Sequence, residues 1–431
     1  MNKADVVVLG AGPAGISAAL ALGPDTIVLE RRHHVGGLAN TFEMEGAVFD
    51  VGGHSFHTPH PEVRQLVFDS LDMYEQRREA RCYAFGSMIS YPFQKHFREL
   101  PNAMVVEECA HGLRDADDSE GAANFEEFLL KRVGSGIAEH FLLPYNRKLW
   151  GGDLKRLSAD WVSQRVASPE GINQEFALSG GERKPLQSDS LVGYPARGGY
   201  GEILRALARK VKKLRFGIKV VRVDAERKKI ATEDGEVFHW HRLISTVPVN
   251  ELLKTMDRVP NSLLRDAQRL EYLSLKLALV VIGHPVDTEI QRIYAAEPRL
   301  PAHKIVINHN SSPYLRSLPH HGITGEVSYS AEKELAPDIE ERFLKSLVEL
   351  KIIKDVKEAL KTVCVDVRYA YPVPTPDRDN IIARLKHWLC EREIYTVGRF
   401  GEWTYINSDE AIYRGLNLGR SLNGSRWSAH A

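Results

Sequence analysis

The sequence predicts an α/β protein, α+β overall, in which a Rossmann-like dinucleotide-binding domain carries an inserted helical domain and an antiparallel-sheet domain. Three observations support this fold class. A glycine-rich turn directly follows an apolar run in the first ten residues, helical and then strand-rich stretches fill the middle of the chain, and a strand, a glycine turn and a helix follow one another from residue 394 onwards. A nucleotide-binding domain assembled from both ends of the chain, with two insertions, accounts for all three.

The first thirty residues have the pattern of a dinucleotide-binding βαβ unit. Residues 6–15 read Val-Val-Val-Leu-Gly-Ala-Gly-Pro-Ala-Gly, and Glu30 closes the apolar run that follows. Gly10 permits a tight turn, Gly12 lets the backbone approach a pyrophosphate, and Gly15 lets helix and strand pack closely. The helix N-terminus would face the phosphates, and the Glu30 carboxylate can accept a ribose hydroxyl.

A second glycine pair favours FAD over NAD as the dinucleotide. Gly36 and Gly37 follow Glu30 closely, which indicates a backbone turn beside a large group. Large FAD enzymes also commonly build the nucleotide domain from both ends of the chain. We therefore expect an FAD-binding domain with Gly37 near the cofactor.

Composition narrows the class of protein. Hydrophobic residues make up 43% and charged residues 26% of the 431, and the formal net charge is zero, so nothing favours a nucleic acid or an anionic membrane as partner. No segment is long and apolar enough to span a bilayer. The four cysteines lack disulfide or metal spacing, which fits a reducing compartment. We expect a cytoplasmic enzyme.

The middle of the chain divides into helical and strand-rich parts. Residues 81–91 read as a hairpin, Asn124 is a candidate N-cap of a helix, and residues 336–361 have an amphipathic helical pattern. We expect the FAD-binding domain to comprise 1–60, 192–250 and 388–431, the helical domain 98–191, and the sheet and substrate domain 61–97 and 251–387.

Four later motifs point to one family. They are Tyr91-Pro-Phe-Gln94, Phe-Leu-Leu-Pro-Tyr-Asn-Arg-Lys-Leu-Trp at 141–150, Tyr-Pro-Val-Pro at 371–374 followed by Arg-Asp at 378–379, and Gly-Arg-Phe-Gly-Glu-Trp-Thr-Tyr at 398–405. With these four motifs in this order, the sequence resembles the UDP-galactopyranose mutase family along nearly its whole length. It resembles the eukaryotic-type branch more closely than the bacterial one.

The resemblance implies a flavin-dependent isomerase. It would interconvert the pyranose and furanose forms of a UDP-hexose, with UDP-galactopyranose to UDP-galactofuranose as the first expectation. Reduced FAD would act through N5 as nucleophile on the anomeric carbon, after activation by NAD(P)H or another reductant. The protein would supply position and electrostatics. The oligomeric state stays open, a homo-oligomer included.

The resemblance assigns a uridine pocket to the first two motifs. Tyr91 and Gln94 match the residues that recognise uracil, whose edge needs a fixed donor and acceptor. Phe141 matches the stacking face, and Asn146 and Trp150 match the rest of the pocket. From the pattern alone, these side chains also fit the aromatic stripe of a helix core.

The resemblance assigns the pyrophosphate to phenols and cations. Arg399, Tyr371, Tyr405 and Tyr294 match the phosphate-binding arginine and tyrosines of the family. Lys304 falls where the family has a second arginine, and it keeps the charge without the bidentate geometry. The alternative for Lys304 is an exposed strand lysine.

The remaining matches lie near the flavin and the sugar. Arg165 matches an arginine close to the flavin carbonyl and the sugar, and Asp189 stands where the family presents a sugar-contacting asparagine. Gly53 and His54 match a loop beside the flavin, in which the glycine carbonyl accepts from reduced N5–H and the histidine orients the loop. His54, Gly53, Arg165 and Arg399 are therefore the catalytic candidates.

The start of the last helix is the final cofactor candidate. Asn407 and Asp409 would place a helix N-terminus at the flavin pyrimidine, where it favours the anionic reduced flavin. Either could instead be an ordinary N-cap. A metal site at His54, His57 and His60 is disfavoured, because their spacing within a loop brings no further ligand.

Two other functions stay open. An FAD-dependent oxidoreductase of the amine oxidase or protoporphyrinogen oxidase type would have the same nucleotide domain, but an apolar substrate tunnel. A mutase acting on another nucleotide sugar would share both the flavin and the phosphate residues.

Overall fold

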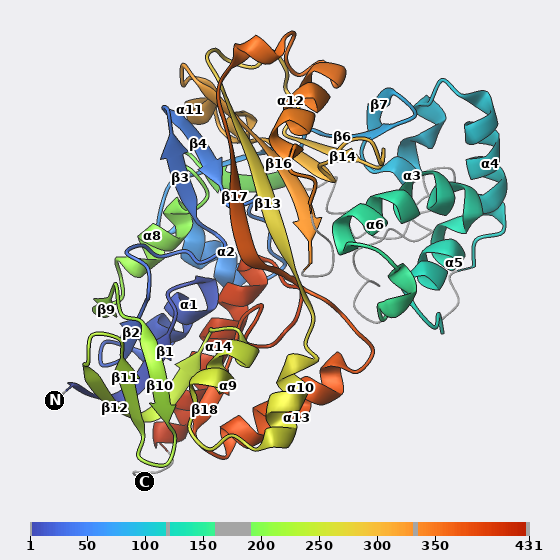
Figure 1. Cartoon of the computed structure of the whole chain (residues 1–431). Coiled ribbons are helices and arrows are strands. Elements are labelled where there is room, and N and C mark those ends of the chain that lie inside the picture. Colours follow the sequence, from blue (N-terminus) through green and yellow to red (C-terminus); the bar gives the residue numbers. More distant parts are fainter. Residues whose placement is uncertain (1, 118–120, 160–190, 331–334, 428–431) are drawn as a thin grey trace.

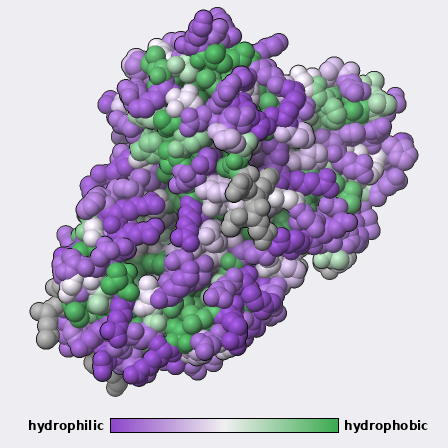
Figure 2. All heavy atoms as spheres, viewed as in Figure 1, coloured by the Kyte–Doolittle hydropathy of each residue, from purple (hydrophilic) through white to green (hydrophobic). Residues whose placement is uncertain are grey.

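A computed structural model describes residues 2–117, 121–159, 191–330 and 335–427. Two seven-stranded sheets organise the molecule, one at each end of the body in Figure 1, and a group of helices lies beside the second sheet. None of the helices in the described ranges is both long and apolar enough to cross a bilayer. Figure 2 shows hydrophilic residues over most of one face, with hydrophobic residues in small separate groups.

The first sheet is the predicted nucleotide-binding sheet. Its strand order is β10-β11-β12-β1-β2-β9, and β18 also pairs with β12. The pairs of β1 with β12 and β2, of β2 with β9 and of β12 with β18 are parallel. Val6, Val7 and Val8 are fully buried, as a strand covered on both faces requires. The strands are β1 (Asn2–Leu9), β2 (Ile27–Leu29), β9 (Lys213–Arg215), β10 (Val220–Asp224), β11 (Lys229–Thr232), β12 (Val237–Ser245) and β18 (Ile394–Thr396).

Two helices from opposite ends of the chain pack on this sheet. Helix α1 (Pro13–Leu22) and helix α14 (Ser408–Trp427) lie side by side near the middle of Figure 1. Gly415 and Gly419, one turn apart, allow the close approach, since a Cβ at these positions would lie 2.3 Å from the Ala14 oxygen and 2.6 Å from the Ala18 oxygen. Four further helices flank this half of the molecule: α8 (Glu202–Ala208), α9 (Val249–Thr255), α10 (Asn261–Gln268) and α13 (Arg378–Cys390).

The second sheet is almost entirely antiparallel and has the strand order β17-β13-β16-β15-β14-β6-β7. The β6–β7 hairpin confirms the prediction for residues 81–91. Smaller pairs, β3 with β4 and β5 with β8, connect the two sheets. The strands are β3 (Thr41–Met44), β4 (Ala47–Asp50), β5 (Met73–Arg77), β6 (Ala80–Ala84), β7 (Ser87–Ser90), β8 (Leu191–Pro195), β13 (Tyr272–Ile282), β14 (Arg292–Ala295), β15 (Lys304–Ile307), β16 (His321–Tyr329) and β17 (Ala359–Pro372).

The predicted helix over residues 336–361 is wrong in its second half. Helix α12 covers only Ile339–Glu349, and Lys351 then takes a left-handed backbone conformation with φ of 57°. A short 3-10 turn, η5 (Val356–Glu358), leads into the long strand β17. From Ala359 onwards the chain pairs with β13, so the tertiary context of the sheet overrides the local helical pattern there.

The inserted helices lie at one side of the second sheet (Figure 1). The Asn124 side chain accepts a hydrogen bond from the backbone N–H of Glu127, which confirms it as the N-cap of α5. The chain continues through a π-helical turn, η2, into the helix that carries the motif at 141–150. The helices and turns are α2 (Pro61–Phe68), α3 (Phe93–His96), η1 (Phe97–Glu99), α4 (Ala103–Arg114), α5 (Phe125–Ile137), η2 (Ala138–Leu142), α6 (Leu143–Trp150), η3 (Leu154–Arg156), η4 (Asn308–Ser311) and α11 (Pro313–Arg316).

The contact between α1 and α14 generates a stability prediction. Replacing Gly415→Ala should lower the free energy of unfolding by about 1–3 kcal/mol, because the new methyl group overpacks a backbone contact. Gly424→Ala is the matched control in the same helix, since nothing lies within 4 Å of its Cβ position. Urea unfolding measures both variants, and equal stability of Gly415→Ala and the wild type would contradict the described contact.

Candidate functional site

The glycine turn after β1 has the geometry that a dinucleotide requires. Gly10 has φ of +98°, and a Cβ there would lie 2.2 Å from the Thr246 hydroxyl oxygen. A Cβ on Gly15 would lie 2.0 Å from the Gly10 carbonyl oxygen, so strand and helix touch. Gly12, by contrast, faces open space toward Gly37, whose Cα lies 3.9 Å from that Cβ position.

The start of α1 completes this cradle. No side chain caps the helix, and its first residue is Pro13, so the first N–H groups of the helix keep their capacity for an anion. The open space at Gly12 lies at the same place. These residues fit the pyrophosphate of a dinucleotide, which would bind there through backbone N–H groups.

Glu30 is fixed at the end of β2. Its carboxylate is buried and accepts hydrogen bonds from the backbone N–H groups of Ala11, at 2.8 Å, and Arg32, at 2.9 Å. Each carboxylate oxygen keeps a second lone pair. The ribose contact that the sequence predicts for Glu30 is compatible with this geometry and stays a prediction.

A large pocket lies between the two sheets. Its empty volume is about 1120 Å³, part of it open to solvent, and polar side chains form much of its wall. Strands of the second sheet, the loop after β4 and the segment before α14 all contribute. Nine predicted residues line it together: Gly53, His54, Tyr91, Tyr294, Lys304, Tyr371, Arg399, Tyr405 and Asn407.

The other predicted uridine residues lie beside the pocket and not on its wall. Phe141 is buried and stacks on Phe93, with ring centroids 4.4 Å apart, and on Tyr145 at 5.9 Å. The amide nitrogen of Asn146 donates to the Leu142 carbonyl within the helix. These contacts match the alternative of a helix core with an aromatic stripe, and a role in binding uridine stays a prediction.

Five further candidates complete the account. Gln94 and Trp150 are buried, and the Trp150 ring lies 6.0 Å from Tyr405. Asp409 is buried in the first turn of α14, and burial raises the pKa of its carboxyl. Arg165 and Asp189 lie outside the described residues.

His54 is held in a neutral state. Its Nδ1 lies 3.0 Å from the Gly52 carbonyl oxygen, and its ring stacks on Tyr200 at 4.8 Å. Burial, together with the charges of Lys304 and Arg399, lowers the pKa of His54 to about 3. The imidazole is therefore uncharged at neutral pH, and the Nδ1–H donates to the carbonyl.

Glu326 is a site residue that the sequence analysis missed. Its buried carboxylate accepts from the backbone N–H of Gly53 at 2.7 Å and from the Tyr371 hydroxyl at 3.2 Å, and it pairs with the Lys304 ammonium at 2.9 Å. Burial would raise the pKa of Glu326, but Lys304 and these hydrogen bonds outweigh it and lower the pKa to about 2. The carboxylate stays ionised.

Lys304 is accordingly not an exposed strand lysine, and that alternative is wrong. Its side chain is 15% exposed, and its ammonium group forms an ion pair with the Glu326 carboxylate. The two residues face each other across the β15–β16 ladder. Only the strand register brings them together, so no local sequence signal indicates the pair. A phosphate contact by Lys304 stays a prediction.

Arg399 is anchored by backbone carbonyls. Its Nε and Nη2 both donate to the Ile406 oxygen, and Nη1 donates to the Ala370 oxygen at 3.0 Å. The guanidinium also lies over the Tyr405 ring. Three of its five N–H groups are thus used to hold the segment before α14, which leaves its predicted phosphate contact to the remaining donors.

Two further arginines line the pocket, and the sequence analysis missed both. Arg78 directly follows β5, and Arg292 begins β14, on the same face as Tyr294 two residues later. Burial would raise the pKa of Tyr294, but Arg292, Arg78 and Lys304 outweigh it and hold that pKa below its usual value. The pocket therefore has a positive potential at the Tyr294 hydroxyl.

Comparison with known proteins agrees with this geometry. The model of the family of flavin containing amine oxidoreductases matches residues 13–381. The chain belongs to that family. The glycine cradle and the family together indicate FAD as the dinucleotide.

Two curated relatives are mutases. The probable UDP-galactopyranose mutase of Klebsiella pneumoniae is 27% identical over 174 residues, and the dTDP-fucopyranose mutase of Escherichia coli is 28% identical over 171. Each alignment covers 37% of this chain and 44% of the relative, so the match spans less than half of either relative.

A solved structure extends the likeness to the whole chain. A crystal structure of reduced UDP-galactopyranose mutase superimposes with a TM-score of 0.89 at 27% identity, covering 98% of this chain and 96% of that one. This match confirms the predicted fold class and the resemblance to UDP-galactopyranose mutases. The assignment to the eukaryotic-type branch stays a prediction.

Removing the Glu326 charge should destabilise the protein. Glu326→Gln leaves Lys304 without its counter-charge, and breaking a buried pair in this way costs about 3–5 kcal/mol in free energy of unfolding. Adding Lys304→Met should restore part of the loss. Urea unfolding measures each variant.

The control for that series is Glu341→Gln, which removes an exposed pair with Lys345 and should change stability little. Equal effects of Glu341→Gln and Glu326→Gln would show that the buried pair contributes no more than a surface one.

His54 should stay neutral across the physiological range. Because its folded pKa lies near 3, below the ordinary 6.5, the unfolded chain takes up the proton first as the pH falls. The stability that neutral His54 contributes is complete above about pH 6.5 and is lost as the pH falls toward 3. Histidine ring signals in NMR spectra should show no titration of His54 between pH 5 and 8, and a midpoint near 6.5 would contradict the assignment.

Proposed function

We propose that this protein is a flavin-dependent mutase that interconverts the pyranose and furanose forms of a UDP-hexose, with UDP-galactose as the first candidate. The observation that carries the proposal is the pocket itself. In a fold that matches a UDP-galactopyranose mutase throughout, the Gly53–His54 loop and a set of tyrosines and cations line the same pocket. We expect the enzyme to act in the cytoplasm.

The cofactor end of the site would be built from five parts. Gly12 and the start of α1 would hold the FAD pyrophosphate, and Glu30 the ribose. Gly53 and neutral His54 would lie beside the flavin ring, and the N-terminus of α14, at Asn407 and Asp409, would face its pyrimidine. Reduced flavin supplies a nucleophilic N5, which is the chemistry that this reaction needs.

At the substrate end of the site, tyrosine hydroxyls and cationic side chains would bind the sugar nucleotide. Tyr294, Tyr371 and Tyr405 offer neutral donors to a pyrophosphate, and Lys304 and Arg399 add charge. The uridine would lie toward Tyr91, with Gln94, Phe141, Asn146 and Trp150 behind it. Arg165 and Asp189 are the proposed sugar contacts.

The polar wall argues against the oxidoreductase alternative. An apolar substrate has no use for these hydrogen-bond donors, and the arginines of the wall would repel a protonated amine. A mutase for another nucleotide sugar is the second candidate, because one relative is a dTDP-fucopyranose mutase. Both candidates share the reaction and differ in the sugar nucleotide.

The test is turnover by the reduced holoenzyme. Protein loaded with FAD, reduced with dithionite without oxygen and mixed with UDP-galactose, should form a second UDP-hexose isomer, resolved by chromatography. The oxidised protein, also without oxygen, is the matched control and should form none, because oxidised N5 is an electrophile.

A panel that includes dTDP-fucose distinguishes the two mutase candidates by their relative rates. The proposal fails if the reduced protein isomerises no nucleotide sugar in the panel, or if the oxidised and reduced forms act at equal rates.

A further inference from the structure

Two arginines from distant parts of the chain meet at one hydroxyl group. Arg78 donates through Nη2 to the Ser55 oxygen at 2.7 Å, and Arg292 donates through Nη2 to the same oxygen at 3.3 Å. Ser55 directly follows His54, and all three residues line the pocket. The pair therefore lies on the pocket wall beside the Gly53–His54 loop.

No direct ion pair joins either guanidinium group to a carboxylate within the described parts of the chain, and the buried Asp50 carboxylate acts on Arg292 only through its longer-range charge. The partners of the two guanidinium groups are the Ser55 hydroxyl and, for Arg292, Tyr294. Arg292 is only 9% exposed, and the Arg78 Nε is buried without a hydrogen-bond partner. Two buried like charges side by side are costly unless an anion joins them.

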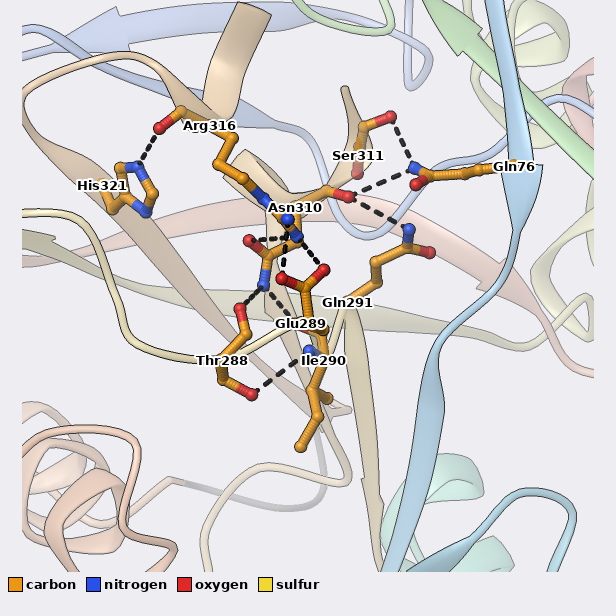
Figure 3. Close-up of polar contacts among 9 residues, drawn as sticks. All are labelled: Gln76, Thr288, Glu289, Ile290, Gln291, Asn310, Ser311, Arg316 and His321. Atoms are coloured by element: carbon orange, nitrogen blue, oxygen red, sulfur yellow. Dashed lines mark hydrogen bonds and ion pairs between the residues drawn. The ribbon is translucent and has the colours of Figure 1, made fainter. Parts of the chain in front are cut away.

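The two segments that carry the arginines are joined by hydrogen bonds of neighbouring side chains, Gln76 and Gln291 (Figure 3). The side-chain amides of Gln76 and Gln291, which lie two residues before Arg78 and one before Arg292, both donate to the Asn310 carbonyl oxygen, at 3.2 and 3.0 Å. The Asn310 amide in turn donates to the carbonyls of residues 288 and 290. The turn at Asn310 thus ties together the two segments that carry the arginines. A site that is already ordered before the ligand arrives loses less conformational entropy on binding.

The other described cations of the pocket are already engaged. Lys304 pairs with Glu326, and Arg399 donates to the carbonyls of Ile406 and Ala370. The carbonyls occupy N–H groups of Arg399 but leave its positive charge, so Arg78, Arg292 and Arg399 together carry the charge that remains for a ligand. The lowered pKa of Tyr294 has Arg78 and Arg292 among its causes.

We propose that Arg78 and Arg292 form an oxyanion-binding subsite that takes an anionic group of the sugar nucleotide and supplies the charge expected of Lys304. The inference rests on the proposed function. Arginine presents a planar fork of N–H groups that matches phosphate and carboxylate oxygens. The oxyanion comes from one of two sources, the pyrophosphate of the nucleotide or a carboxylate on the hexose.

The experiment measures ligand binding by calorimetry on the FAD-loaded full chain. The probes are inorganic pyrophosphate, uridine, UMP, UDP, UDP-galactose and UDP-galacturonate, and the variants are Arg78→Gln and Arg292→Gln. Each variant should weaken binding of the anion about tenfold to a hundredfold, which is the usual effect of losing a charge-assisted hydrogen bond, and should leave uridine unchanged.

Arg81→Gln is the matched control. Arg81 lies three residues after Arg78, but its guanidinium group forms an ion pair with Glu79. Removing the Arg81 charge should therefore not change the binding of the anions. Arg78→Lys and Arg292→Lys keep the charge without the fork and should weaken binding by less than the glutamine variants. Flavin content and thermal unfolding identify variants that fail to fold. If a glutamine variant does not fold, the anion affinity of the corresponding lysine variant, compared with the wild type, tests the proposal.

The ligand panel distinguishes the two sources. A loss shared by UDP, UDP-galactose and pyrophosphate assigns the pair to the pyrophosphate, and a loss confined to UDP-galacturonate assigns it to a carboxylate on the sugar. Unchanged binding of every anion, an equal loss in Arg81→Gln, or a wild type that binds none of the anions overturns the inference. Anion binding that depends on the arginines but brings no mutase turnover leaves the subsite standing while the proposed function fails.

Discussion

The carboxylate of Glu326 holds the pocket together, because three separate segments depend on it. It accepts a hydrogen bond from the Gly53 backbone, pairs with Lys304 on the neighbouring strand and accepts a bond from Tyr371 on β17. An ionised carboxylate inside a protein is tolerated only when its oxygens are satisfied. These partners satisfy it, and in return each is fixed in place. The Gly53–His54 loop, β15 and β17 are therefore tied to one another through a single side chain.

The described cations of the pocket differ in whether a counter-charge or a backbone carbonyl already engages them. Lys304 is neutralised by Glu326, and Arg399 is tied to the carbonyls of Ile406 and Ala370. Arg78 and Arg292 donate hydrogen bonds to hydroxyl groups and form no direct ion pair in the described parts of the chain. From residue type alone the four cations would be expected to act alike. Their surroundings instead give Lys304 and Arg399 a part in holding the site together, and leave Arg78 and Arg292 to bind an anion.

Sequence reasoning succeeded where the signal is local. The turn at Gly10 and the N-cap at Asn124 each follow from a few adjacent residues, and both are confirmed. It failed where distant strands decide the outcome. The helix predicted over 336–361 yields to the ladder between β13 and β17, and the Lys304–Glu326 pair exists only through the register of β15 and β16. A single sequence carries no direct record of that register.

The packing of α1 against α14 has a consequence for synthesis. Helix α1 leaves the ribosome several hundred residues before the helix that covers it, and at about 5–20 residues per second the delay is roughly 20–80 s. Throughout that time the face of α1 at Ala14 and Ala18, which Gly415 and Gly419 later contact, is open to water and to other nascent chains. The packing of α1 in the nucleotide domain is therefore completed only once α14 has been synthesised.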